Sequence, residues 1–276
     1  MALVLKAVRA GQGSRWIGDA LRLFARRPLA FTALAAVPGA LAMLLPLLPL
    51  LLAAGVFFVM PLVSLGFMVA AQSALLDGPV HMRQFAEPLR GAGPRRHALL
   101  KLCAGYLGLM AAAALVASAF TGDAFEQLRV LDRQSAEFAA KAELLAPAIT
   151  RGLSVWMLLY GLISVPYWHA PALVHWGGQG AKQALFSSTL ALWRTRGAIL
   201  VYLFSWVGLM LGVFMVAGIL GGLVGAQGPS PSGALAFLLV LVSSASVAVF
   251  YISALFCFND TFGGAVPAPA EEPPAP

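Results

Sequence analysis

The stretch PLAFTALAAVPGALAMLLPLLPLLLAAGVFFVMPLVSLGFMVAAQSALL, residues 28–76, contains no charged side chain. As a helix these 49 residues would extend roughly 73 Å, more than twice the roughly 30 Å hydrocarbon thickness of a bilayer. Pro46 and Pro49 lie near the middle of the stretch, where each removes a backbone donor and disfavours helix in the residue before it. The stretch therefore predicts two membrane crossings joined by a tight turn.

The composition extends this conclusion to the whole chain. Hydrophobic residues make up 60% of the 276 residues and charged residues 11%, against about 25% charged residues in soluble domains. The net charge of +7 is carried mostly beside apolar segments, where anionic lipid headgroups are nearer partners than nucleic acid. Cys103 and Cys257 lie in apolar segments without a metal-binding or CxxC spacing. We expect an all-α polytopic membrane protein without a cofactor or a nucleic-acid partner.

Apolar runs between charged flanks predict six spans, arranged as three helical hairpins. Their approximate bounds are 29–48, 51–75, 102–120, 152–174, 198–224 and 234–258. They divide the chain into an amphipathic segment at 1–27, a six-helix membrane domain at 28–258 with an outer helical loop at 121–151, and a tail at 259–276. The tail is rich in Pro and Ala, so we expect it to be disordered.

Lysine and arginine counts predict the orientation. Residues 1–27, 77–101 and 175–197 carry six, five and three of these residues, whereas the segments on the opposite side carry four in all. Because basic residues concentrate on the cytoplasmic side, we expect both termini in the cytoplasm.

A short amphipathic segment precedes the first span. In SRWIGDALRLFARRP, residues 14–28, the apolar side chains fall on one helical face and most charged ones on the other. Two interpretations remain open: a helix lying on the cytoplasmic leaflet, or a helix packed on the protein's own loops. A similar segment, GAKQALFSSTLALWRTRGA, precedes the fifth span at 180–198, and VHMRQFAEPLR at 80–90 is a weaker third copy.

The stretch SVPYWHAPALVHWGGQGAKQALFSSTLALWRTRGAILVYLFSW, residues 164–206, resembles a bacterial family of uncharacterised six-span inner-membrane proteins. The order of features is the one seen in that family: an aromatic cluster, the sequence APALV, a glycine turn, an Ala-rich helix and a Trp-Arg pair. PLVSLGFMVA, residues 61–70, is similar as well. The resemblance implies the bacterial plasma membrane and the six-span topology, and it transfers no functional residue.

The only sizeable polar segment on the outer side is the loop at 121–151. Apolar residues at a 3–4 spacing predict an amphipathic helix over about 128–145. It would either cover the outer ends of the spans or pair with a second copy or a periplasmic partner. For the chain as a whole, the partners expected beside the lipid bilayer are another membrane protein or a second copy.

Ionisable side chains are absent from the predicted span centres, where small hydroxyl and glycine residues take their place. Because a charged side chain at the bilayer centre is costly, it is kept there only where function requires it. Without such side chains, catalysis and ion coupling are therefore not indicated. We interpret these small and hydroxyl residues mainly as helix-packing positions: Ser64, Tyr160, Ser244, and the pairs Gly208/Gly212 and Gly218/Gly222.

His169 and His175 are the sharpest candidates for an interfacial site near the cytoplasmic ends of the spans. Aromatic residues surround both, which is typical of a membrane-interface belt. The alternative is a site that pairs His169 with Asp77 or Asp260. Pro166 and Pro171 bracket His169 and predict a break in the helix.

Three hypotheses of function follow. The first is a non-catalytic membrane protein that binds anionic lipids or protein partners through basic residues at the cytoplasmic face: Arg26, Arg27, Arg95, Arg96, Arg194 and Arg196. The second is a transporter or channel for a small uncharged or amphiphilic solute, which would place Ser64, Tyr160 and Ser244 beside a cavity. The third, a lipid-headgroup enzyme using His169, His175 and Asp77, ranks last because no nucleophile or phosphate-binding motif accompanies them.

Overall fold

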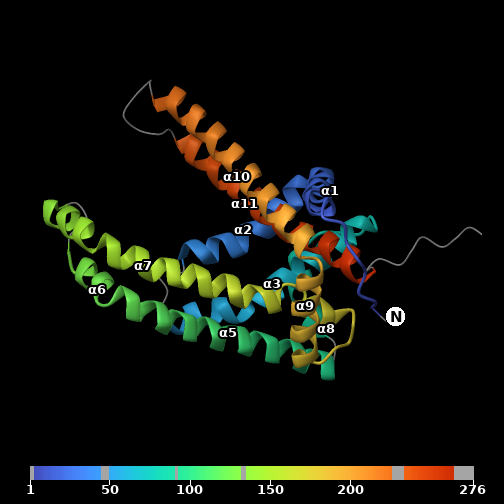
Figure 1. Cartoon of the computed structure of the whole chain (residues 1–276). Coiled ribbons are helices and arrows are strands. Elements are labelled where there is room, and N and C mark those ends of the chain that lie inside the picture. Colours follow the sequence, from blue (N-terminus) through green and yellow to red (C-terminus); the bar gives the residue numbers. More distant parts are fainter. Residues whose placement is uncertain (1–2, 45–49, 91–92, 132–134, 226–232, 264–276) are drawn as a thin grey trace, which may run out of the picture.

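A computed structural model describes residues 3–44, 50–90, 93–131, 135–225 and 233–263, and every regular element within these ranges is helical (Figure 1). The all-α prediction is therefore confirmed. The elements are α1 (Gln12–Arg26), α2 (Pro28–Leu44), α3 (Leu50–Leu75), η2 (Met82–Phe85), α4 (Glu87–Arg90), α5 (Pro94–Thr121), α6 (Ala124–Arg129), α7 (Ala136–Tyr167), α8 (Ala170–His175), α9 (Ala181–Arg194), α10 (Arg196–Gly225) and α11 (Gly233–Phe262).

Within the described ranges, five helical segments are long and apolar enough to cross a membrane. They are Ala54–Leu75, Pro94–Thr121, Ala136–His175, Arg196–Gly221 and Leu239–Phe262. The first predicted span corresponds to α2, whose apolar part Pro28–Ala40 is shorter than these, and the turn at 45–49 lies outside the described residues. The chain is thus a multi-pass membrane protein, and its sixth crossing remains a prediction.

Three helix boundaries differ from the predicted spans because polar residues near a span can continue its helix. α5 begins at Pro94 rather than near residue 102. α7 is one helix from Ala136 to Tyr167, so the predicted outer-loop helix and the fourth span are continuous. The helix begins after Ser135, whose hydroxyl oxygen accepts a hydrogen bond from the Phe138 N–H at 3.0 Å. α11 continues to Phe262, so residues 259–262 are helical rather than part of a disordered tail; residues 264–276 lie outside the description.

The helices form two arms that diverge from a shared end. In Figure 1, α5 and α7 pack side by side in one arm, α10 and α11 run along the other, and α1, α8 and α9 lie at the shared end. α2 packs mainly on α11 rather than on α3. The arrangement of three separate hairpins therefore remains a prediction.

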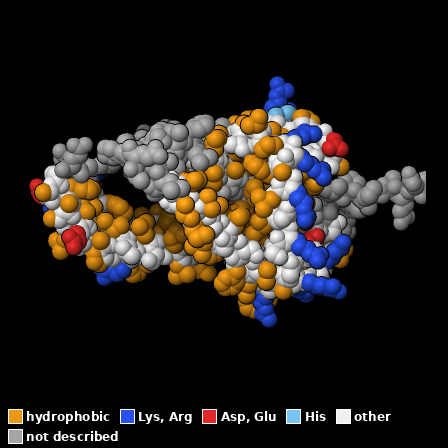
Figure 2. Space-filling view, turned by 90° about the horizontal axis from the view of Figure 1, so that it is seen from above, with side chains coloured by type: hydrophobic (Ala, Val, Ile, Leu, Met, Phe, Trp, Pro, Cys, Tyr) orange, Lys and Arg blue, Asp and Glu red, His pale blue; other side chains and the backbone are white. Residues whose placement is uncertain are grey.

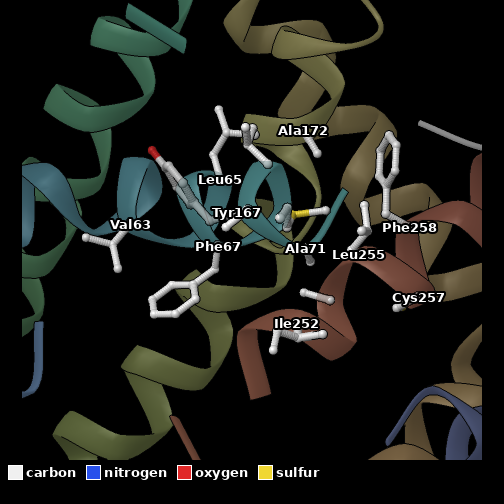
Figure 3. Close-up of a cluster of buried hydrophobic side chains, with 14 of the residues drawn as sticks. Val63, Leu65, Phe67, Ala71, Tyr167, Ala172, Ile252, Leu255, Cys257 and Phe258 are labelled. Atoms are coloured by element: carbon white, nitrogen blue, oxygen red, sulfur yellow. The ribbon is translucent and has the colours of Figure 1, made fainter. Parts of the chain in front are cut away.

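Burial is concentrated at the shared end. Figure 3 shows apolar side chains from α3, α7, α8 and α11 converging there, among them Phe67, Tyr167, Leu255 and Phe258. Most side chains of α7 and α10 along the arms are instead exposed. Such apolar, outward-facing helices fit a hydrocarbon surrounding.

The glycine pairs of α10 do not form the packing contacts predicted for them. A Cβ atom added at Gly208, Gly212 or Gly218 would meet no atom within 4 Å, and the side chain at position 222 lies outside the description. That packing prediction is wrong for these three glycines within the described chain, because the side of α10 on which their Cβ atoms would lie is open.

α1 packs inside the protein rather than on the leaflet. Its apolar face lies against α10 and α11, where Trp16 is only 1% exposed. The approach is close because a Cβ at Gly13 would collide with the Ala198 carbonyl oxygen and come within 2.6 Å of the Tyr202 nitrogen. Of the two interpretations of this helix, packing on the protein is confirmed, but the surface that α1 covers is formed by helices α10 and α11 rather than by loops. The amphipathic pattern indicates that one face of the helix is covered, and the structure shows that α10 and α11 cover it.

Candidate functional site

Basic side chains gather at the shared end of the two arms. Figure 2 shows Lys and Arg along this end of the molecule, while hydrophobic side chains dominate the visible surface beyond it. Five of the six predicted arginines are exposed, and we call them the arginine cluster: Arg26, Arg95, Arg96, Arg194 and Arg196. Among the described residues, ion pairs within 4.0 Å join Arg22 to Asp19 and Arg129 to Glu126. No member of the arginine cluster is neutralised in this way by a carboxylate in the described part of the chain.

Arg27 has a structural role instead. Its guanidinium donates to the carbonyl oxygen of Asp77 at 3.1 Å and to that of Gly78, which ties the start of α2 to the turn after α3. Asp77 has a φ of 56° in this turn, a conformation that few residues other than glycine adopt. Asp77 therefore holds Arg27 through its backbone, and its carboxylate pairs with neither His169 nor His175.

α9 presents an apolar stripe beside the arginine cluster. Phe186 and Trp193 are 69% and 68% exposed, and Leu190 lies between them on the same helical face. The guanidinium carbon of Arg196 lies 5.2 Å from the centre of the Trp193 ring, within the range of a cation–π contact. The opposite face of α9 is buried and packs on α7 and α8. An exposed apolar face bordered by cations is typical of a helix at a membrane interface.

The predicted break around His169 is confirmed, since α7 ends at Tyr167 and α8 begins at Ala170. The His169 N–H donates to the Ser188 hydroxyl oxygen at 3.0 Å, and that hydroxyl donates to the Val165 carbonyl at 3.4 Å. Ser188 thereby satisfies backbone groups that the break releases. The His169 side chain is fully buried, with Nε2 3.7 Å from the Cys257 sulfur, and so does not reach a headgroup.

The predicted histidine–aspartate site does not assemble. The Asp260 carboxylate accepts from the Trp16 indole nitrogen at 2.8 Å and from the Gln12 amide at 3.1 Å, which fixes α1 to α11. His175 is half-buried and its ring lies 5.2 Å from that of Trp176. In the described part of the chain, no three His, Cys, Asp or Glu side chains lie close enough together to hold a metal ion.

A cavity of about 330 Å³ lies where the two arms meet. Its lining residues come from α3, α5, α7, α9, α10, α11 and the break after α7, and none of those residues is acidic or basic. Ser64 and Tyr160, both selected from the sequence, line this cavity, whereas Ser244 is not among its lining residues. Sequence reasoning missed Tyr106 and Tyr251, although tyrosines within apolar spans were a usable signal.

The chain is similar to a protein of Burkholderia thailandensis described as a probable inner membrane protein. The two are 30% identical over 273 residues, which cover 98% of this chain and 95% of the relative. No family model matches the chain, and no solved structure matches it. The similarity confirms the resemblance to bacterial inner-membrane proteins inferred from residues 164–206, and the relative's description gives a location without an activity. The chain belongs to the family of inner membrane proteins that includes this Burkholderia thailandensis protein.

Proposed function

We propose that this protein is a non-catalytic membrane component that binds anionic lipids of the cytoplasmic leaflet through its arginine cluster. The observation that carries the proposal is the exposure of these arginines, without carboxylate partners among the described residues, beside the apolar stripe of α9. A surface of this kind has unmatched positive charge at the depth where lipid phosphates lie.

The chemistry of the cluster suits phosphate. A guanidinium offers paired N–H donors that match two phosphate oxygens, and each basic residue near an anionic leaflet contributes about 1 kcal/mol of attraction. Arg95 lies in the first turn of α5, and Arg194 and Arg196 flank the junction of α9 and α10. Rigid helix ends thus present the charges, which lowers the ordering cost of binding.

The α9 stripe would set the depth of the cluster. Phe186, Leu190 and Trp193 would enter the acyl boundary, while Arg196 beside the Trp193 ring would stay among the headgroups. Apolar insertion and charge attraction then act on the same helix.

In this proposal the chain crosses the membrane six times, with both termini in the cytoplasm. The support is the excess of basic residues in the segments at 1–27, 77–101 and 175–197. Single cysteines at the exposed positions Gln183 and Ala139, in a chain with Cys103 and Cys257 replaced by alanine, would be treated with an impermeant maleimide in spheroplasts. We expect labelling at Ala139→Cys alone; labelling at Gln183→Cys alone would reverse the orientation.

Lipid retention tests the proposal. Arg95→Gln, Arg194→Gln and Arg196→Gln would be combined, with Arg129→Gln, Lys141→Gln and Arg151→Gln combined as a control that removes the same charge elsewhere. Native mass spectrometry would measure the phosphatidylglycerol retained by each purified protein. Three contacts of about 1 kcal/mol predict at least a tenfold loss in the first variant and little change in the control. Equal retention by the two variants would reject the proposal.

A second candidate function, movement of an uncharged or amphiphilic solute, is favoured by the cavity where the arms meet. Ser64 and Tyr160 line it, and a transport path would make both reachable by water-borne reagents. Single cysteines at these two positions should then react with a polar thiol reagent in native membranes. Protection of both positions would exclude a water-filled path.

A further inference from the structure

We propose, building on the second candidate function, that the cavity binds one uncharged amphiphile with a planar ring head, carbonyl or hydroxyl oxygens on that ring, and a hydrocarbon tail. The proposal concerns binding alone. A failure to detect transport, or to detect lipid binding by the arginine cluster, would therefore leave it unaffected.

Aromatic side chains form much of the cavity wall. Tyr106 and Tyr167 meet edge to face with centroids 5.0 Å apart, and Trp168 and Phe250 do so at 5.7 Å. Phe250 also meets Tyr251 at 5.5 Å, nearly at a right angle. Such an assembly offers both ring faces and ring edges to an occupant. A planar ring can use both through stacking and edge-to-face contacts, which a hydrocarbon chain alone cannot do.

The polar side chains of the wall carry hydroxyls, apart from Trp168 with its indole N–H. Ser64, Ser164 and Tyr160 line the cavity, and the Ser164 hydroxyl donates to the Tyr160 carbonyl oxygen at 2.7 Å while keeping its own lone pairs. Ring oxygens would find donors and acceptors of matching strength here. A charged headgroup would find no counter-charge among the lining residues and would lose its hydration. The ligand is therefore uncharged, unlike the lipids proposed for the arginine cluster.

Two lining residues on the two diverging arms are partly exposed: Tyr160 on α7 is 43% exposed and Leu203 on α10 is 46% exposed (Figure 1). We therefore infer that the cavity opens between α7 and α10. A tail leaving the cavity on this side would enter the surrounding hydrocarbon. The volume of about 330 Å³ is at the lower end of the range for ligand sites, which suits a ring head with its tail outside.

Gly161 allows the cavity to be filled without disturbing the fold. It lines the cavity within α7, and a Cβ added there would meet no atom within 4 Å. Gly161→Leu should therefore occupy ligand space without colliding with the protein, and its helix propensity is higher than that of glycine. Gly208→Leu is the matched control, because Gly208 is also helical and unobstructed and is not among the lining residues.

The full chain in nanodiscs would be titrated with a benzoquinone bearing a ten-carbon tail, and with 1-decanol as a probe that has the tail without the ring. Native mass spectrometry would count the bound molecules. We expect the wild type and Gly208→Leu to bind the quinone at least tenfold more tightly than decanol, and Gly161→Leu to lose at least tenfold in quinone affinity. Thermal unfolding would confirm that both variants remain folded.

The proposal would be overturned by a lack of quinone binding in the wild type, by equal binding of quinone and decanol, or by equal affinities of Gly161→Leu and the wild type. The variant with Arg95, Arg194 and Arg196 replaced by Gln should bind the quinone normally. A loss of quinone binding in that variant would also overturn it, because the ligand would then depend on charge. Failure of phosphatidylglycerol retention alone leaves the cavity site intact.

Discussion

Replacing Trp16 tests whether the first amphipathic helix belongs to the folded core. Trp16 lies on α1, is 1% exposed, and has its ring centroid 5.9 Å from that of Tyr202 on α10. Trp193 lies on α9, the second amphipathic helix, and is 68% exposed. The two tryptophans therefore form a matched pair, alike in residue type and in their place on a helix that precedes a span.

The expected cost of Trp16→Ala follows from its burial. Removing a buried tryptophan costs about 3–5 kcal/mol, and the Asp260 carboxylate would also lose the indole donor at 2.8 Å. Trp16→Phe keeps most of the packing and removes the hydrogen bond, so its loss should be near 1.5–3 kcal/mol. Trp193→Ala removes an outward-facing ring and should change the unfolding free energy by about 0.5 kcal/mol or less.

The assay is reversible unfolding of the purified protein in mixed micelles, with denaturing detergent as the variable. Helix content and the fluorescence of the remaining tryptophans would report the transition. Equal stability of Trp16→Ala and Trp193→Ala would refute the packing of α1 on α10 and α11. It would indicate that α1 lies in the leaflet and contributes little to the fold.

Gly13→Ala should lower the unfolding free energy by about 1–3 kcal/mol, because the added Cβ would collide with the α10 backbone. Gly18→Ala is the control and should be neutral or stabilising, because a Cβ at Gly18 meets open space. Equal costs of the two substitutions would contradict the close crossing of α1 and α10. Gly66→Ala should cost a similar amount, since its Cβ would collide with the Phe85 ring, and faster proteolysis near Phe85 would report the loosened contact. Cys257 is fully buried, so it should react with N-ethylmaleimide only on unfolding, and rapid modification of the folded protein would count against its contact with His169.

Much of the helical pattern follows from the sequence because apolar length and helix breakers act locally. The long uncharged run at 28–76 predicts membrane helices, and α3 ends at Leu75, as expected from the turn that begins at Asp77. Pro166 and Pro171 predict the break at His169, because a proline ring clashes with the preceding turn of a helix and removes a backbone donor. The helix ends were less predictable, because α5 and α11 continue into polar segments where hydropathy no longer reports helix.

The candidate sites depend on contacts between distant parts of the chain. The sequence selects the arginines by charge, but it does not show that Arg27 is held by backbone carbonyls while Arg196 lies over Trp193. It selects Ser64 and Tyr160 but cannot place them beside Tyr251, since three different helices bring them to one cavity. It suggested a partner for His169 among the aspartates, whereas the His169 Nε2 lies 3.7 Å from the Cys257 sulfur.

Photocrosslinking in vesicles gives the most direct test of lipid binding at the arginine cluster. Vesicles would contain the protein and a phosphatidylglycerol with a photoreactive group in its headgroup, and crosslinked peptides would be mapped by mass spectrometry. We expect crosslinks concentrated in 94–96 and 181–196, and their loss when Arg95, Arg194 and Arg196 are replaced by glutamine. Crosslinks spread evenly over the chain, or concentrated around α6 at Ala124–Arg129, would contradict lipid binding at the arginine cluster.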